Sequence, residues 1–311
     1  MKIVSFDEGY MQADELWVFL NSSLEYDFIT WHMFNRVVLE DPNRDDSLYL
    51  IALEDNVPVG CLIGAYRKRE PPEWVDKQKD TAWIKVLCVR PEHREKPVFE
   101  HLLEEFIKLS KDAGKKTIIY GGFPSWHFSP GLNIRYDYYL RKLKENGFAK
   151  RGEVVDYEVD LLHLYYPDYV KKLEEEAVAS GIVFREASLK EKDKVLSWIK
   201  EKFSPGWATE AKMAFKEKWG GVWIAEEDEE ILGFSVYGGL EPNWFGPIGV
   251  DPQKRRKGLG TVLLYKTLKS MRERGQRYII IPWTEHLFFY SQLPGIKEIK
   301  HYIKLSKNIE G

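Results

Sequence analysis

The feature that most restricts the fold of this 311-residue chain is an internal repeat. An apolar hairpin pattern covers residues 47–66 and occurs again at residues 222–238, each time with acidic or polar turn residues between two strand-like runs. Within it, Ile51-Ala52 matches Ile224-Ala225. A repeat of this length predicts two similar domains, because each copy must bury its own apolar face.

The repeat continues beyond the hairpin in the same order in both halves. The matching segments are a strand ending before Pro91 or Pro252, a helical pattern at 98–113 or 259–275, a strand at 116–120 or 277–281, and a glycine at Gly147 or Gly295. The hairpin and the third strand should be antiparallel, whereas strand, crossover helix and next strand should form a right-handed parallel unit. The sequence therefore predicts an α/β fold with a mixed central sheet flanked by helices in each copy.

The boundary between the copies is predicted from a helix signal. Residues 167–181 place a proline near the helix start and a glycine after its end. We therefore expect a first domain at residues 1–165, a linker helix at 166–180 and a second domain at 181–311. In the second domain the pattern predicts helices at 190–203 and 209–219.

Composition limits the classes of partner. The net charge of -3 and the pI near 6.2 give no overall attraction to nucleic acid or to an anionic membrane. No segment reaches the length of a membrane span. Cys61 and Cys88 lie in strand-like segments without metal-ligand spacing, so we expect two reduced thiols, no metal and a cytoplasmic protein.

A strand, a basic turn and a helix follow one another at residues 244–264. Pro252 ends the strand because it has no amide to donate. The first amides of the following helix have no partner within the helix, and the helix dipole places partial positive charge there. Gly258 and Gly260 would let a diphosphate approach these amides closely. The turn is therefore predicted to bind an anion.

The pattern Arg255-x-x-Gly258-x-Gly260 after this strand resembles the acetyl-CoA loop of the GCN5-related N-acetyltransferases. The resemblance implies that Ile248, Gly249 and Val250 line the pantetheine arm of acetyl-CoA and that a backbone amide there meets the oxyanion. It also implies a set of residues around the pyrophosphate, namely Arg255, Arg256, Lys257, Gly258, Leu259, Gly260 and Thr261.

The same resemblance indicates catalytic residues. Residues 288–296 are similar to a family string in which a tyrosine protonates the departing thiolate, which makes Tyr290 the candidate acid. Many family members carry a glutamate base on the strand before the loop, but this chain has Trp244 there. The base is left open, and the candidates nearby are Glu241, Glu285 and His286. Trp244 and Trp283 either shape an acceptor pocket or belong to the core.

The first copy lacks the features of the loop. Pro97 and Phe99 stand where the second copy has Gly258 and Gly260, and Glu95 stands at the position of Arg256. Proline removes an amide donor, and phenylalanine fills the space that a phosphate would need. We therefore predict that the first domain does not bind acetyl-CoA.

These observations favour an acetyl-CoA-dependent N-acetyltransferase that uses direct transfer in a ternary complex. The acceptor would be a small-molecule amine or a peptide, with no nucleic-acid or membrane partner, and the protein would be a monomer or a homodimer. The alternative from a different class is a non-catalytic CoA-binding regulatory or interaction protein. A nucleic-acid-binding role for the basic run at residues 254–257 is a third hypothesis, which the overall acidity opposes.

Overall fold

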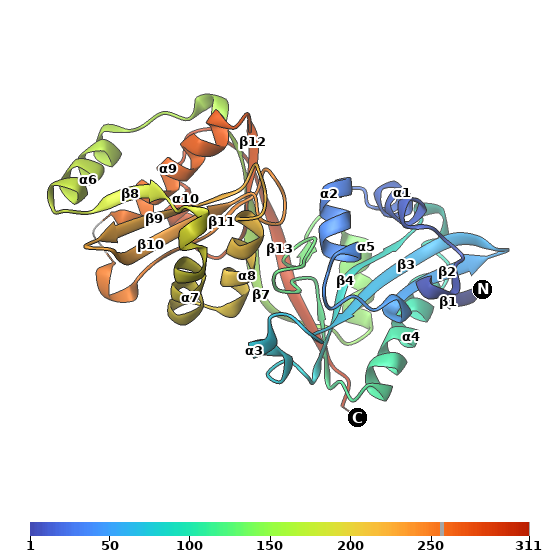
Figure 1. Cartoon of the computed structure of the whole chain (residues 1–311). Helices are drawn as coiled ribbons and strands as arrows, with labels where there is room; N and C mark the ends of the chain where they lie inside the picture. The colour runs from blue at the N-terminus through green and yellow to red at the C-terminus, as the bar shows by residue number, and fades with distance from the viewer. Residues whose placement is uncertain (256–257, 311) are drawn as a thin grey trace. The chain divides into compact units, whose positions relative to one another are not determined.

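The structure is a computed structural model that describes residues 1–255 and 258–310. The chain forms two compact units, which are coloured by position along the chain in Figure 1. Unit 1 consists of residues 1–154 together with the segment from His301 onward, and unit 2 consists of residues 155–300. Both units combine a mixed or antiparallel sheet with flanking helices, so the predicted α/β class is confirmed.

The elements of the first half of the chain are β1 (Lys2–Ser5), α1 (Ala13–Ser23), α2 (Trp31–Phe34), β2 (Tyr49–Glu54), β3 (Val57–Tyr66), α3 (Pro72–Val75), β4 (Thr81–Val89), α4 (Val98–Asp112), β5 (Thr117–Tyr120), β6 (Leu132–Asn133), α5 (Asp137–Glu145) and β7 (Ala149–Asp160). Those of the second half are α6 (Asp168–Ala179), β8 (Val183–Glu186), α7 (Lys192–Lys202), α8 (Pro205–Ala214), β9 (Gly221–Glu227), β10 (Glu230–Tyr237), β11 (Phe245–Val250), α9 (Leu259–Glu273), β12 (Tyr278–Thr284), α10 (Leu287–Tyr290) and β13 (Ile296–Asn308).

The sheet of unit 1 has the order β1-β2-β3-β4-β5, followed by the end of β13. The β2–β3 and β3–β4 pairs are antiparallel, and β4 and β5 are parallel with α4 as the crossover helix. This is the predicted arrangement. The strand after β5 was not predicted: residues 305–308 of β13 pair antiparallel with β5, and β7 follows β13 in the strand order.

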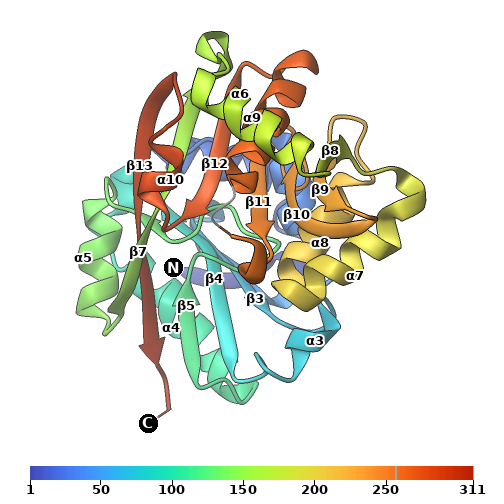
Figure 2. The same ribbon diagram turned by 90° about the vertical axis from the view of Figure 1, so that its left-hand side faces the viewer.

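Unit 2 contains an antiparallel sheet in the order β8-β9-β10-β11. Alternation along β9 sends Val222 and Ile224 toward a core shared with α7 and α8, and sends Trp223 and Ala225 toward α6 and α9. Figure 2 shows α6 lying over α9, and the Lys266–Glu174 ion pair joins the two helices. The sheet is thus covered by helices on both faces.

Two long strands explain why the compact units differ from the predicted division at 166–180. Residues 155–160 of β7 pair with β12 in unit 2, although the repeat assigns them to the first copy. The end of β13 pairs in unit 1, although the repeat assigns it to the second copy. Gly147 and Gly295, which precede these strands, have nearly the same φ of 79° and 80°. Each unit therefore contains a strand segment from the other half of the sequence.

One predicted helix is displaced. The pattern predicted residues 209–219, but α8 spans Pro205–Ala214. The Ser204 hydroxyl accepts the amide of Trp207, and Pro205 occupies the first turn, where a missing N–H costs nothing. The Ser-Pro pair is therefore a helix start, whereas the sequence interpretation took it for a loop.

Candidate functional site

The candidate loop joins β11 to α9 in unit 2. Asp251 follows the strand, accepts the amide of Gln253 at 2.9 Å and pairs with Lys202 at 3.0 Å. Gly258 caps the helix with φ 72°, a left-handed conformation that favours glycine. Val262 is the first residue of the helix to donate back, to the Gly258 carbonyl at 3.1 Å. The amides of residues 259–261 therefore have no acceptor within the helix, as at any helix N-terminus.

The basic part of the loop is described only in part. Arg255 is exposed, and its Nε lies 3.4 Å from the carbonyl oxygen of Val250. The predicted residues Arg256 and Lys257 lie outside the described residues. Lys254 pairs loosely with Glu227, with 3.9 Å between the charged atoms. The described basic side chains of this turn are thus those of Lys254 and Arg255, which lie beside the start of α9.

β11 separates from β12 along most of its length. Trp244 bridges to Ile280 in parallel, and the Ile280 amide donates to Asn243 at 2.9 Å. Within the described residues, β11 and β12 belong to different sheets, and the opposite edge of β12 pairs with β7. Residues 248–250 are each partly exposed. The two strands thus leave a splayed edge along the C-terminal half of β11.

The backbone groups on this edge can be assigned from the register. The Asp251 amide donates to Leu232 of β10 at 2.8 Å, and Gly249 faces Phe234. Because backbone N–H groups alternate along a strand, the amides of Ile248 and Val250 face the opposite edge, toward β12. These are the predicted pantetheine-lining residues, and two of their amides face the splay.

The matching edge of unit 1 is closed by a side chain. The hydroxyl of Tyr139, from α5, accepts the Val89 amide at 2.9 Å and lies 3.3 Å from the Val89 carbonyl oxygen. Val89 opposes Gly60 on β3, as Val250 opposes Gly233 on β10. Phe99, in the first turn of α4, is fully buried. The position that is splayed in unit 2 is therefore occupied by protein in unit 1.

The two glycines of the loop have different surroundings. A Cβ at Gly258 would lie 2.6 Å from a methyl group of Leu173 on α6, so this glycine also allows the close approach of that helix. A Cβ at Gly260 would meet its nearest atoms, on Val250 and Phe289, at ordinary contact distances of 3.6 to 3.8 Å. Only Gly258 is therefore required by the fold itself.

Tyr290 lies at the end of α10 and is buried. Its ring centroid is 5.9 Å from that of Tyr157, 6.4 Å from Phe245 and 4.9 Å from Phe289. Burial raises the pKa of the Tyr290 phenol above its ordinary value, with a smaller contribution from Tyr157. The phenol is therefore protonated at neutral pH, as a proton donor must be.

The three candidate bases lie in different surroundings. Glu241 is buried at 7% exposure between β10 and β11, and its carbonyl oxygen accepts the Trp244 amide at 3.0 Å. Glu285 and His286 are exposed in the turn between β12 and α10. Glu241 is thus the only one of the three that lies inside the protein, at the end of the splay where the strands still pair.

The sequence interpretation missed Glu210 on α8. Burial raises the pKa of the Glu210 carboxyl to about 8. Its carbonyl oxygen lies 2.7 Å from the position of a Cβ on Gly239, two residues before Glu241. The Gly238-Gly239 pair was the available signal, because adjacent glycines after a strand often mark close backbone approach. A carboxyl group with a perturbed pKa is a candidate for proton transfer.

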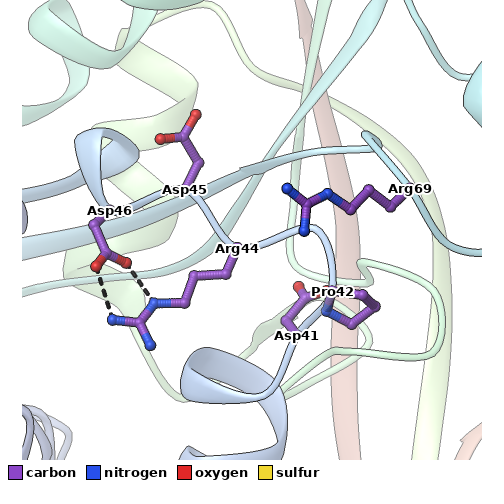
Figure 3. Close-up of a pocket in the computed structure, with 6 residues that line it drawn as sticks. All are labelled: Asp41, Pro42, Arg44, Asp45, Asp46 and Arg69. Atoms are coloured by element: carbon purple, nitrogen blue, oxygen red, sulfur yellow. Dashed lines mark hydrogen bonds and ion pairs between the residues drawn. The ribbon is translucent and has the colours of Figure 1, made fainter.

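A charged pocket of about 490 Å³ lies in unit 1 (Figure 3). It is lined by Asp41, Pro42, Arg44, Asp45, Asp46 and Arg69. Its carboxylates are paired within the unit: Arg44 contacts Asp46 at 2.5 and 2.7 Å, Asp41 contacts Lys85 at 2.5 Å, and Asp45 contacts Lys68. None of the predicted site residues lines this pocket.

In the described part of the chain, no helix is both long and apolar enough to cross a membrane. Among the same residues, no group of three or more His, Cys, Asp or Glu side chains is placed to hold a metal ion.

The chain belongs to the acetyltransferase (GNAT) family, because the family pattern matches residues 12–128 and 192–287, more than half of its length. The family match falls on both copies of the repeat, which agrees with tandem GNAT-like domains. A search of curated proteins found no match.

Solved structures share the fold at low sequence identity. One is described as a GCN5-related glucosamine N-acetyltransferase region in a fungal multi-domain β-N-acetylglucosaminidase, with TM-score 0.78 and 16% identity; the match covers 98% of this chain but only 38% of that one. A GCN5-related N-acetyltransferase from Sphaerobacter thermophilus has TM-score 0.62 at 13% identity, covering 89% and 86% of the two chains. A tandem GNAT protein from the clavulanic acid biosynthesis pathway has TM-score 0.55 at 13% identity, covering 85% and 83%.

Proposed function

We propose that this protein is an acetyl-CoA-dependent N-acetyltransferase that acts in unit 2 and transfers the acetyl group directly to an amine in a ternary complex. One observation carries the proposal: the backbone edge at Val250 is splayed beside a free helix end, whereas the matching edge at Val89 is bonded to Tyr139. The difference supports one cofactor site, and it is in the copy with Gly258 and Gly260.

The residues of unit 2 fit the cofactor chemically. The amides of residues 259–261 and the side chain of Arg255 suit the pyrophosphate, which is an anion that accepts several hydrogen bonds. The amides of Ile248 and Val250 suit the amide-containing pantetheine arm and the thioester carbonyl oxygen. Acetyl-CoA, when bound, supplies an activated thioester to which an amine can add.

Side chains at the two ends of the gap between β11 and β12 would transfer the protons. Tyr290 keeps its proton at neutral pH and would give it to the sulfur as the carbon–sulfur bond breaks. Glu210 and Glu241 are the candidates to take the proton that the amine loses, because both come from the segments packed at the start of β11. Of these, Glu210 has a pKa close to that of an effective base near neutral pH.

A non-catalytic CoA-binding protein is the second candidate. The observation that favours it is Trp244, which immediately precedes β11 and stands where many acetyltransferases have a glutamate base. Both candidates bind acetyl-CoA, so binding alone does not separate them. The acceptor, the oligomeric state and the cytoplasmic location remain predictions from the sequence.

The deciding experiment measures thiol release from acetyl-CoA in the presence of a panel of amines. Glucosamine comes first, because it is the acceptor in the description of a structural neighbour. Diamines, peptides with a free N-terminus and lysine peptides complete the panel. An enzyme releases CoA in proportion to an acetylated amine seen by mass spectrometry. A protein that binds acetyl-CoA and leaves it intact with every amine would support the second candidate instead.

A further inference from the structure

Strand β12, which precedes α10 and Tyr290, contains a strained backbone conformation. In the pairing of β12 with β7, Ile281 opposes Tyr157 and Thr284 opposes Val155, so Pro282 and Trp283 together oppose Asp156. Two residues opposite one form a β-bulge, which redirects the side chains around it. Trp283 has φ 50°, a left-handed conformation that is costly for a tryptophan. Such a conformation persists only where its surroundings fix it.

Asp156 holds Trp283 in this conformation. Its Oδ1 accepts the Trp283 amide at 2.7 Å, and the residue is only 5% exposed. The hydrogen bond goes to the backbone of the strained residue itself, so it acts directly on the conformation. A buried bond between a carboxylate and an amide is stronger than a neutral one. The carboxylate therefore stabilises the bulge at the residue where it is most strained.

The next residue on β7 holds the helix that carries Tyr290. The Tyr157 hydroxyl donates to the carbonyl oxygen of Leu287 at 2.9 Å, and its ring packs 5.9 Å from the ring of Tyr290. Since α10 has only four residues, few backbone bonds of its own fix the position of Tyr290. Asp156 and Tyr157 thus form hydrogen bonds with the two ends of the segment from Trp283 to Leu287.

Asp156 and Tyr157 both come from outside the second copy of the repeat. They precede α6 in sequence, and the repeat assigns β7 to the first copy, yet residues 155–160 are part of unit 2. We propose that Asp156 and Tyr157 are positioning residues of the acetyltransferase site in unit 2: Asp156 fixes Trp283 at the end of β12, and Tyr157 fixes α10 so that Tyr290 reaches the splay. The inference rests on the proposed function.

The test compares four full-length variants. Asp156→Ala removes the acceptor for the Trp283 amide, whereas Asp156→Asn keeps an oxygen that can accept it. Tyr157→Phe keeps the ring and removes only the bond to Leu287. Glu158→Gln is the matched control, because Glu158 lies on the same strand but opposes Ile280 and pairs with Lys300.

Three quantities are measured for each variant: kcat with the best amine, the Kd of CoA by calorimetry, and backbone hydrogen exchange over residues 283–292. We expect Asp156→Ala and Tyr157→Phe to lower kcat by on the order of tenfold with unchanged Kd, because they misplace reacting groups and leave the pyrophosphate loop intact. They should also speed exchange in this segment. Asp156→Asn should recover most of both losses, and Glu158→Gln should match the wild type.

The outcomes separate this inference from the proposed function. If the wild type acetylates no amine, the proposed function fails, and the exchange data then decide the inference: faster exchange in Asp156→Ala that Asp156→Asn restores supports it. Wild-type kcat and wild-type exchange in both Asp156→Ala and Tyr157→Phe would overturn it. So would a loss in kcat that is matched by weaker CoA binding, because the residues would then support the unit in general and not its catalytic end.

Discussion

The two units differ most at one matched backbone position. Val89 in unit 1 and Val250 in unit 2 end equivalent strands, and each opposes a glycine on the preceding strand. In unit 1 the Val89 amide donates to the Tyr139 hydroxyl, and the helix that follows starts with buried Val98 and Phe99. In unit 2 the edge of Val250 faces a splay, and the helix starts at two glycines. The same fold can therefore hold a ligand or fill the same space with its own side chains.

The interiors of the units show a second contrast. Unit 1 buries the ion pair of Lys85 with Asp41, and neither side chain is exposed. In unit 2, Glu210 has a pKa raised by burial alone, without an opposite charge that would lower it. Paired charges are suited to hold a fixed structure, whereas a carboxyl group near its titration point is suited to exchange a proton. This contrast, like the first, favours unit 2 as the unit that carries the functional site.

The largest effect is expected from Gly260→Asp. A carboxylate in the first turn of α9 is favourable for the helix and has room, since the nearest atoms to a Cβ there are 3.6 Å away. The same charge repels a diphosphate, so CoA affinity should fall by on the order of 100-fold or more while the melting temperature is unchanged or higher. Calorimetry measures both. Gly260→Asn is the uncharged control of the same size, and an equal loss of affinity in the control would mean that bulk and not charge is responsible.

Tyr290→Phe should have the next largest effect. It removes the phenolic proton and leaves the ring packing against Phe289 and Tyr157 in place. We expect kcat to fall on the order of 10- to 100-fold with little change in the KM for acetyl-CoA. Steady-state kinetics with thiol detection gives both constants. An unchanged kcat would remove Tyr290 from the proposed chemistry.

Tyr139→Phe tests the closed edge in unit 1. The variant leaves the buried Val89 amide without its hydroxyl partner, which should cost about 1–2 kcal/mol of unfolding free energy. Because the ring still fills the space, CoA binding should not change. Denaturant unfolding and calorimetry check the two parts. A gain of a second CoA site in this variant would show that one hydroxyl is all that closes unit 1.

The smallest effect is the pH dependence that Glu210 gives to stability. Its pKa in the folded state, about 8, lies above the ordinary glutamate value, so the folded protein holds a proton there that the unfolded chain releases. This contribution is complete below about pH 4.5 and is lost as pH rises through 8. Glu210→Gln should therefore raise the melting temperature by a few degrees at pH 9, and the gain should shrink toward pH 5. Equal differences at both pH values would contradict the assignment.

The sequence predicted what local patterns encode. The repeat gave two α/β copies, and the spacing of Gly258 and Gly260 after the strand ending at Val250 gave the loop. The exchange of β7 and β13 could not be predicted, because the alternation of a strand identifies its faces but not its distant partner. The bond from Tyr139 to Val89 and the left-handed Trp283 are also non-local, since each depends on residues far away in sequence. Glu210, whose side chain is half-buried, was missed because nothing next to it in sequence shows that its pKa is raised.

The central claim is that one unit of this tandem chain holds the cofactor. Its most direct test is the number of CoA molecules bound per chain at saturation, measured by calorimetry on the wild-type protein. We expect one. A value of two would mean that unit 1 binds CoA despite Tyr139 and Phe99, and would contradict the account.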